Sequence, residues 1–304
     1  MYLLGIVLTI ILGAFLQFTF CCGTTAEAEV VSEPEVIADP KPEKISNPLA
    51  IADPNGNFEY SATQDNFNFN RSEANIVIPV SMEVETGALK LVSYLNDNPS
   101  KSIDITGHYS SNENYSGALP NLGMARANEV KKYLVEKGAS AKQINIFGQL
   151  QEDLIAEDNI LVGPTEITIK TSDEAALAAA DDELKKMAEA IKADPLVLYF
   201  NTNESEINLT TAQRQKIANI SKYLDKVEDA VCLTVGHTDS RGKLKKNIEL
   251  GQDRADFAKE YLINQGGIAA SRIEAISKGP KEPIASNKTK KGQAKNRRTV
   301  ITLK

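Results

Sequence analysis

Hydrophobic residues follow three different patterns along the chain. Residues 1–22 are apolar and carry no charged side chain, which is typical of a membrane-spanning helix of about 20 residues. From residue 193 onward, short apolar runs alternate with longer segments in which apolar residues recur every three or four positions, the pattern of strands and amphipathic helices. The predicted strands are residues 196–200, 231–235, 272–277 and 298–303. Their order with two helices predicts an α+β domain, βαβαββ, with helices on one face of a mixed sheet.

Two segments link these parts. Residues 23–47 are rich in Glu, Pro and Ala, a composition that keeps a linker extended. Residues 171–192 are rich in Ala, Leu, Glu and Lys, which favours a helix. No Lys or Arg lies between residues 22 and 41, so the positive-inside tendency places the body of the protein outside the cytoplasm. We expect an uncleaved anchor at residues 1–22, and the alternatives are a lipoprotein signal ending at Cys21 or Cys22 and a cleaved signal peptide.

The chain repeats itself with an offset of about 129 residues. Both histidines of the chain follow a glycine, at Gly107-His108 and Gly236-His237, and Arg126-Ala127 corresponds to Arg254-Ala255. An offset of this size indicates a duplicated domain and not a short-period solenoid. We therefore predict a first repeat at residues 48–170 and a second repeat at residues 193–304.

Composition excludes several classes of function. The net charge of −7 argues against a general nucleic-acid-binding protein. The three cysteines form no disulfide framework, no His/Cys/acid cluster has zinc spacing, and no phosphate-binding glycine fingerprint follows a strand. His237, Asp239 and Ser240 are too close in sequence to form a nucleophile–base–orienter chain. We expect no enzyme, no metal and no cofactor.

One acid and one base form the candidate site of the second repeat. Asp239 follows a predicted strand, and Arg254 lies fifteen residues later inside the next predicted helix. If strand and helix are neighbours, the two side chains face one site. A carboxylate holds an ammonium group, and a guanidinium holds a carboxylate through two hydrogen bonds, so the pair suits a zwitterion. The alternative is that Asp239 caps a turn and Arg254 makes an internal ion pair.

Further residues around this pair form a longer motif. Gly236-His237-Thr238-Asp239-Ser240-Arg241-Gly242 is followed by Asn247, Leu250 and Arg254-Ala255, and Asn296-Arg297-Arg298 precedes the last predicted strand. The motif resembles that of the peptidoglycan-binding OmpA-like (OmpA/MotB) C-terminal domain family, over residues 193–304. Gly251 and Asn201 depart from the Ser and Asp usual in the family. The resemblance implies that the diaminopimelate of the wall peptide is bound by Asp239 and Arg254, with Thr238, Asn247 and Asn203 bordering the site and Arg298 at its edge.

The first repeat differs at these positions. Ser110 stands where the second repeat has Asp239, and Leu119 stands near the position of Asn247, whereas Arg126 is kept. Glu113 lies nearby in the loop and could substitute for the missing acid. We expect the first repeat to be a degenerate copy with a structural or partner-binding role.

Together these features predict a membrane-anchored envelope protein of two OmpA-like domains, with its body in the periplasm. The resemblance implies that the second domain binds peptidoglycan noncovalently and tethers membrane to wall. The alternative is an envelope scaffold that binds other proteins and not the wall. MotB proteins of ion-driven motors also join a single span to such a domain. That role needs a membrane carboxylate, and residues 1–22 contain none.

Overall fold

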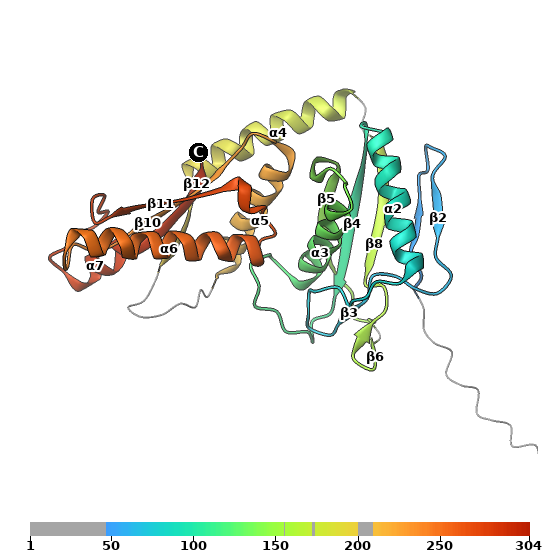
Figure 1. Cartoon of the computed structure of the whole chain (residues 1–304), viewed down its shortest axis with the longest axis horizontal. Helices are drawn as coiled ribbons and strands as arrows, with labels where there is room; N and C mark the ends of the chain where they lie inside the picture. The colour runs from blue at the N-terminus through green and yellow to red at the C-terminus, as the bar shows by residue number, and fades with distance from the viewer. Residues whose placement is uncertain (1–46, 155, 172–173, 200–208) are drawn as a thin grey trace, which may run out of the picture. The chain divides into compact units, whose positions relative to one another are not determined.

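The computed structural model describes residues 47–154, 156–171, 174–199 and 209–304 (Figure 1). The predicted anchor at residues 1–22, nearly all of the predicted linker at residues 23–47, and Asn203 lie outside the described residues. Among the helices of the described ranges, none combines the length and the apolar character that crossing a membrane requires.

A four-stranded mixed sheet forms the second repeat, with the strand order β11-β10-β12-β9. Strand β10 is parallel to β11 and antiparallel to β12, and β12 is antiparallel to β9. The strands are β9 (Leu196–Tyr199), β10 (Cys232–His237), β11 (Ile273–Gly279) and β12 (Arg298–Leu303), and the helices are α5 (Thr211–Lys226), α6 (Leu244–Asn264), the 3-10 helix η2 (Ala270–Arg272) and α7 (Lys290–Asn296). The predicted βαβαββ order is confirmed, and the short helix α7 precedes the last strand.

Helix α5 begins at a capping box. The side chain of Thr210 accepts from the backbone of Gln213, while the side chain of Gln213 accepts from the backbone of Thr210. Such reciprocal bonds satisfy two of the amide groups that a helix leaves unpaired at its start. Ile217, Ile220 and Leu224 then follow at helical spacing, and all three are buried in the core of the second repeat. These three apolar residues therefore form the inward face of α5.

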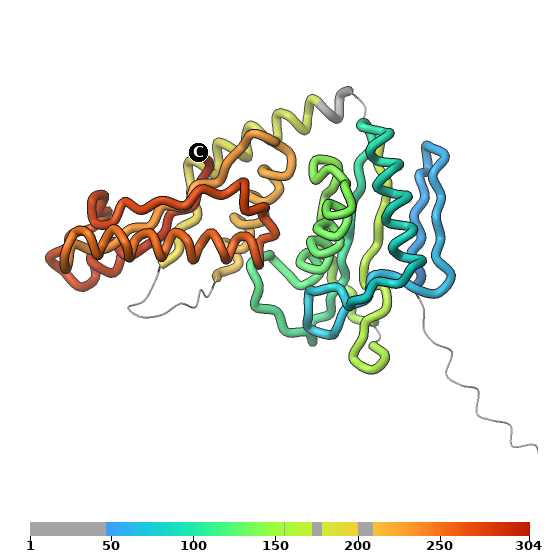
Figure 2. Tube along the Cα trace, viewed as in Figure 1, coloured from blue at the N-terminus to red at the C-terminus, as the bar shows by residue number. Residues whose placement is uncertain are grey.

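Helix α6 does not bury all of its large apolar residues. Phe257 and Tyr261 pack against the core of the second repeat, but Leu250 is 42% exposed. The buried side of α6 carries the polar or small residues Asn247, Gly251, Arg254, Ala255 and Ala258, together with Leu262. The helix lies close along β10 and β11 (Figure 2). Small residues on the buried side permit this close approach, so the larger Leu250 is turned outward.

The close approach rests on a pair of glycines in each repeat. A Cβ atom added to Gly236 in β10 would lie 1.8 Å from the carbonyl oxygen of Gly251 in α6. In the first repeat, a Cβ atom on Gly107 would lie 2.0 Å from the carbonyl oxygen of Gly123. Real Cβ atoms do not approach a backbone oxygen this closely, so only glycine fits at the strand position. Gly251, the departure from the family pattern, is thus part of this contact.

The first repeat has a central sheet with the order β5-β4-β8. Strand β4 is parallel to β5 and antiparallel to β8, as β10 is to β11 and β12. The elements of this sheet and its helices are α2 (Met82–Asp97), β4 (Lys101–Tyr109), α3 (Leu122–Glu136), the 3-10 helix η1 (Ala141–Gln143), β5 (Ile144–Leu150) and β8 (Thr165–Thr171). The shared topology supports the predicted duplication.

Two further small sheets accompany this central sheet in the first repeat. Strands β1 (Ala50–Ala52) and β2 (Glu59–Ser61) form an antiparallel hairpin, and β3 (Phe69–Asn70), β7 (Ile160–Leu161) and β6 (Ala156–Glu157) form a second small sheet. The hairpin lies beside α2 (Figure 2), where the Tyr60 hydroxyl donates a 2.5 Å hydrogen bond to the Glu83 carbonyl oxygen. The first repeat therefore departs from a plain βαβαββ order.

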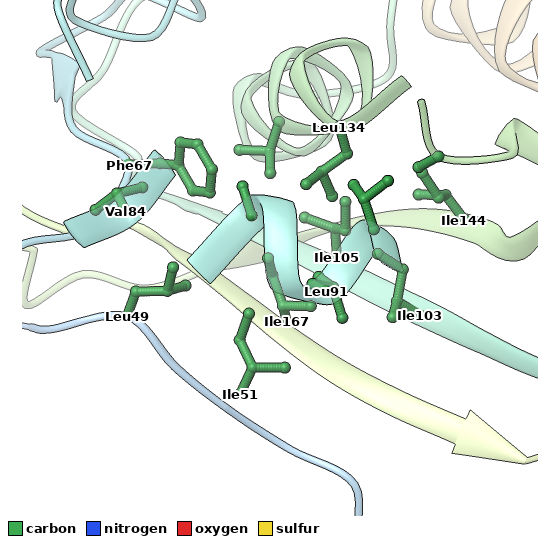
Figure 3. Close-up of a cluster of buried hydrophobic side chains, with 14 of the residues drawn as sticks. Leu49, Ile51, Phe67, Val84, Leu91, Ile103, Ile105, Leu134, Ile144 and Ile167 are labelled. Carbon is green, nitrogen blue, oxygen red and sulfur yellow. The ribbon is translucent and has the colours of Figure 1, made fainter. Parts of the chain in front are cut away.

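The core of the first repeat lies between its sheet and α2 and α3 (Figure 3). Strand β4 contributes alternate residues, Ile103 and Ile105, because successive side chains of a strand point to opposite faces. Ile167 of β8, Leu91 of α2 and Leu134 of α3 contact the same cluster. All five side chains are at most 3% exposed. This buried layer holds the sheet and helices in the arrangement that positions the end of β4.

Helix α4 (Glu174–Ala193) occupies the segment between the repeats, as predicted from composition. Ile191 near its C-terminal end is 7% exposed and belongs to the core of the second repeat, and Met187 and Ala188 pack against the same core. The Lys222 ammonium group of α5 lies 2.8 Å from the Glu183 carboxylate of α4. The helix is therefore packed on the second repeat and is not a free spacer.

Candidate functional site

Asp239 lies in the turn that follows β10 and is only 6% exposed. Its carboxylate accepts hydrogen bonds from the backbone amide of Arg241 at 3.1 Å, from Nη2 of Arg241 at 3.2 Å and from Nη1 of Arg297 at 3.1 Å. Burial alone raises the pKa of this carboxyl, but the hydrogen bonds from Arg241 and Arg297 outweigh it and hold the pKa below its usual value. Asp239 is therefore a buried, ionised carboxylate at neutral pH.

Arg254 reaches the same place from α6. It is 9% exposed, and its Nη1 atom donates a 3.1 Å hydrogen bond to the carbonyl oxygen of His237, two residues before Asp239. Burial, together with the charge of Arg297, lowers the pKa of Arg254, while the charge of Asp239 opposes this shift. An arginine remains protonated despite such a shift. The structure thus brings the predicted acid and base to one end of β10.

The two arginines before the last strand have different surroundings. Arg297 contacts Asp239, and its Nε atom is buried without a hydrogen-bond partner among the described residues. Arg298 instead donates to the carbonyl oxygen of Glu282 at 3.2 Å, and burial lowers its pKa. We predicted Arg298 at the edge of the site, but Arg297 is the one that pairs with the acid. Arg297 is the C-cap residue of α7, whereas Arg298 is the first residue of β12, and only the former contacts Asp239.

Sequence reasoning also missed Arg241. Its backbone amide and its guanidinium both bond Asp239, and its carbonyl oxygen accepts a 2.9 Å hydrogen bond from Nδ2 of Asn247. The predicted site residue Asn247 is 7% exposed and holds the Arg241 turn in place. The signal that could have identified Arg241 as a site residue is its position two residues after Asp239 in a turn, since an Asp side chain commonly accepts a hydrogen bond from the backbone amide two residues later.

Thr238 and His237 border the same turn. The backbone amide of Thr238 donates to the carbonyl oxygen of Gly279 at 2.9 Å, while its hydroxyl is buried without a partner among the described residues. His237 is 3% exposed, and burial with the nearby charge of Arg298 lowers its pKa to about 4. The imidazole is therefore neutral at pH 7.

A buried asparagine connects the loops around the site. Asn296 is fully buried, and its amide accepts from the backbone amides of Ile284 and Ala285 at 2.9 and 3.0 Å. The same side chain donates to the Ala285 carbonyl oxygen at 2.8 Å and to the Asn287 side-chain oxygen at 2.9 Å. Asn287 in turn accepts a 3.2 Å hydrogen bond from the backbone amide of Ser240, next to Asp239. One side chain thus ties the β11–α7 loop to the turn of the site.

These residues form what we call the Asp239 site: Asp239, Arg241, Asn247, Arg254 and Arg297. Three cations surround one carboxylate in a mostly buried cluster, which suits recognition of a ligand that carries carboxylate and ammonium groups. Among the described residues, no group of three or more His, Cys, Asp or Glu side chains is arranged to hold a metal ion.

At the equivalent place in the first repeat, the retained arginine also has an acid partner. Ser110 stands at the position of Asp239, but Arg126 has an acid partner, because both of its Nη atoms bond the carboxylate of Glu113. Arg126 also donates a 2.8 Å hydrogen bond to the carbonyl oxygen of His108, the bond that Arg254 makes to His237. Glu113, from the loop after β4, therefore pairs with the arginine that the first repeat retains, although it does not stand at the position of Asp239.

Comparison with known sequences matches both repeats. Residues 68–166 and 199–297 each match the sequence profile of the OmpA family, and together they cover more than half of the 304 residues. Relatives include the probable lipoprotein YiaD of Escherichia coli (strain K12), 39% identical over 114 residues, which are 36% of this chain and 52% of YiaD. The peptidoglycan-associated lipoprotein of Buchnera aphidicola is 32% identical over 122 residues, 40% of this chain and 68% of that protein.

Longer relatives and solved structures are matched over part of their length. Outer membrane protein Omp38 of Acinetobacter baumannii is 36% identical over 108 residues, which are 36% of this chain and 30% of Omp38. The chain therefore spans less than a third of Omp38 and about half of YiaD. The crystal structure of the peptidoglycan-associated lipoprotein from Burkholderia pseudomallei is 25% identical, with a TM-score of 0.32, over 37% of this chain and 92% of that chain.

The motif, the repeated sheet topology and the two profile matches agree with one another. Because the profile covers more than half of the residues, the chain belongs to the OmpA family.

Proposed function

We propose that the second repeat binds peptidoglycan noncovalently and that the protein tethers a membrane to the cell wall. The observation that carries this proposal is the Asp239 site, where a buried carboxylate and several guanidinium groups meet at the end of β10. The names of two relatives, peptidoglycan-associated lipoproteins from Buchnera aphidicola and Mesorhizobium japonicum, support a wall ligand. Binding of this kind is recognition without chemistry, so no catalytic group is required.

The ligand group that fits is the zwitterionic end of diaminopimelate. A carboxylate offers about four acceptor positions, and Arg241 and Arg297 fill three of those on Asp239. One position is left for an ammonium donor of the ligand. Arg254 then holds the adjacent ligand carboxylate, because a guanidinium binds a carboxylate through two parallel hydrogen bonds. Thr238 adds a buried hydroxyl next to the acid.

The proposed location is the bacterial envelope, with the repeats in the periplasm. It rests on the apolar character of residues 1–22 and on the absence of Lys and Arg from the following residues up to Lys41. Relatives named as outer membrane proteins and lipoproteins support this location. We propose no nucleic-acid partner. The additional partners proposed for the first repeat are envelope proteins.

The proposal is tested by sedimentation of the full chain, in mild detergent, with isolated diaminopimelate-containing sacculi. Asp239→Asn removes the partner of the ligand ammonium, and Arg254→Gln removes the partner of the ligand carboxylate. Each change leaves one ligand charge without its counter-charge, which costs about 2–5 kcal/mol of binding. We expect the affinity to fall at least about 30-fold. Asp253→Asn and Lys246→Gln are matched controls, because both residues are exposed on α6, and we expect them to bind as the parent does.

A second arm tests the ligand group itself. Free diaminopimelate should compete with sacculi for the protein, whereas Nα-acetyl-lysine amide, which has the terminal ammonium but no carboxylate, should not. Thermal unfolding of each variant shows whether loss of binding reflects loss of fold. The Asp239 site does not bind peptidoglycan if the parent fails to sediment with sacculi, or if the folded Asp239→Asn and Arg254→Gln variants bind sacculi as well as the parent does. The protein is then better described as an envelope scaffold.

A further inference from the structure

The guanidinium of Arg126 in α3 is completely satisfied by the protein. An arginine has five N–H donors. The Nε group donates to the Glu73 carbonyl oxygen, Nη1 donates to His108 and Glu113, and Nη2 donates to Asn70 and Glu113. The Arg126 side chain is 0% exposed, and that of Glu113 is 1% exposed. Each donor thus has an acceptor in a site closed to solvent.

The carboxylate of Glu113 is held by more than its arginine. It accepts two hydrogen bonds from Arg126, a 2.9 Å bond from the backbone amide of Ser72 and a 3.0 Å bond from the backbone amide of Ser110. Four donors from three separate segments therefore converge on one carboxylate. Burial raises the pKa of Glu113, but these hydrogen bonds outweigh it and hold the pKa below its usual value.

This convergence is more than an internal ion pair requires. An ion pair needs only the two side chains, whereas here backbone amides from distant positions are also directed at the carboxylate. Ser72 reaches its place with a left-handed backbone, φ 62°, a conformation that costs a non-glycine residue about 1–2 kcal/mol. Backbone amides that converge in this way form an anion-binding site. The arrangement therefore has the character of a receptor that surrounds a carboxylate.

The second repeat places Arg254 in the same relation to its strand. Arg126 and Arg254 each donate to the carbonyl oxygen of the strand-ending histidine, and each follows a glycine pair that brings helix and strand together. We propose that the first repeat contains a carboxylate-binding site occupied by its own Glu113. Glu113 acts as an internal ligand. Because Arg126 corresponds to Arg254, the position of the Glu113 carboxylate shows where the carboxylate of an external ligand is bound by Arg254 in the second repeat.

This inference explains why the first repeat departs from the second. Ser110 cannot supply the charge of Asp239, so an external zwitterion would lose its ammonium partner. With Glu113 in place, the carboxylate position is filled from within the chain, and the site is closed. The chemical class that the emptied site would take is a small carboxylate, such as acetate or formate. The inference about Glu113 does not depend on wall binding, because its readout requires no peptidoglycan, whereas its extension to Arg254 rests on the proposed function.

The test removes the internal ligand from the full chain and supplies an external one. Glu113→Ala leaves Arg126 buried without its counter-charge, so the melting temperature of the first repeat should fall. Sodium acetate and sodium formate should then raise the melting temperature of the variant by at least about 2–4 °C above that in sodium chloride of equal ionic strength. The parent should show no difference between the three salts.

Glu152→Ala is the matched control, because Glu152 is an exposed acid of a neighbouring loop that also accepts a backbone hydrogen bond, from Ser111. It should show no response specific to acetate. A Glu113→Ala variant that folds only in carboxylate salts supports the inference as well. Equal stabilisation by acetate, formate and chloride would overturn it. A variant that folds in none of these salts would also overturn it, since Glu113 would then serve the fold alone.

Discussion

The Nη1 atom of Arg254 donates a 3.1 Å hydrogen bond to the carbonyl oxygen of His237. This bond joins the buried side of α6 to the end of β10, and it places the guanidinium beside the turn that carries Asp239. Arg126 makes the same bond to His108 in the first repeat. The position of the base is therefore a property of the shared fold, while the acid that faces it differs between the repeats.

The contact between Gly236 and Gly251 should be essential for this geometry. Gly236→Ala puts a Cβ atom 1.8 Å from a backbone oxygen, so α6 must move away from β10. We expect a loss of about 1–3 kcal/mol in the free energy of unfolding, measured by denaturant titration, together with weaker sacculus binding. Gly242→Ala is the control, because a Cβ atom there has nothing within 4 Å and only its positive φ opposes the change. An equal or smaller effect at Gly236 would contradict the proposed contact.

The adjacent arginines Arg297 and Arg298 provide a second prediction. Arg297→Gln removes a hydrogen bond that lowers the pKa of Asp239, so that pKa should rise toward its usual value. Arg298→Gln should leave it unchanged, because Arg298 bonds the Glu282 carbonyl oxygen instead. Carboxyl carbon NMR titration of Asp239 measures both effects. A pKa that responds to Arg298 and not to Arg297 would show that the roles are reversed.

Much of the second repeat could be predicted from its sequence. The apolar runs of β9, β10, β11 and β12 are short and bounded by turn residues, so their order and the sheet type followed from the pattern. The proximity of Asp239 and Arg254 also followed, because a turn after a strand and the middle of the next helix meet when the two elements pack side by side. The duplication was visible because residue types recur at one offset in both copies.

Other features depend on contacts that a pattern does not contain. Leu250 is exposed although it is apolar, because the close contact of Gly251 with β10 turns this larger neighbour toward solvent. Arg298 was predicted at the edge of the site, whereas the contact of Arg297 with Asp239 was not predicted, because the direction of each side chain depends on the local backbone before β12. Predicting the hydrogen bonds between Glu113 and Arg126 would have required the path of the loop after β4. In each case the deciding quantity is a local backbone direction, which composition and spacing do not specify.

His237 should make the stability of the second repeat sensitive to acid. Its pKa is about 4 in the folded protein and about 6.5 in an unfolded chain. Between these values the unfolded state binds the proton and the folded state does not. The stabilising contribution is therefore complete above about pH 6.5 and is lost as the pH falls toward 4, by on the order of 3 kcal/mol.

Denaturant unfolding between pH 7.5 and pH 4 measures this loss, and His237→Gln should make the dependence weaker. Burial also lowers the pKa of His108, so His108→Gln is needed to separate the contribution of the first repeat. If the unfolding free energy of the His237→Gln variant falls with pH as steeply as that of the parent, the imidazole is not the group responsible.

Asn296 should control the loops around the Asp239 site through its four hydrogen bonds. Asn296→Asp replaces an amide donor by a carboxylate oxygen that faces the Ala285 carbonyl oxygen and the Asn287 side-chain oxygen. We expect a loss of more than about 2 kcal/mol in the free energy of unfolding, because a buried charge without a counter-charge is added. Asn296→Ala should cost less, since it adds no charge.

The matched control for this change is Asn219→Asp on α5, where the asparagine accepts a 3.0 Å hydrogen bond from Gln215 at the surface. A surface substitution of this kind changes stability by no more than about 0.5 kcal/mol. Sacculus binding should decrease in folded Asn296→Ala, because Asn287 then no longer holds the Ser240 amide next to Asp239 in one position. Unchanged binding in that variant would mean that the turn keeps Asp239 in place through Arg241 and Arg297 alone.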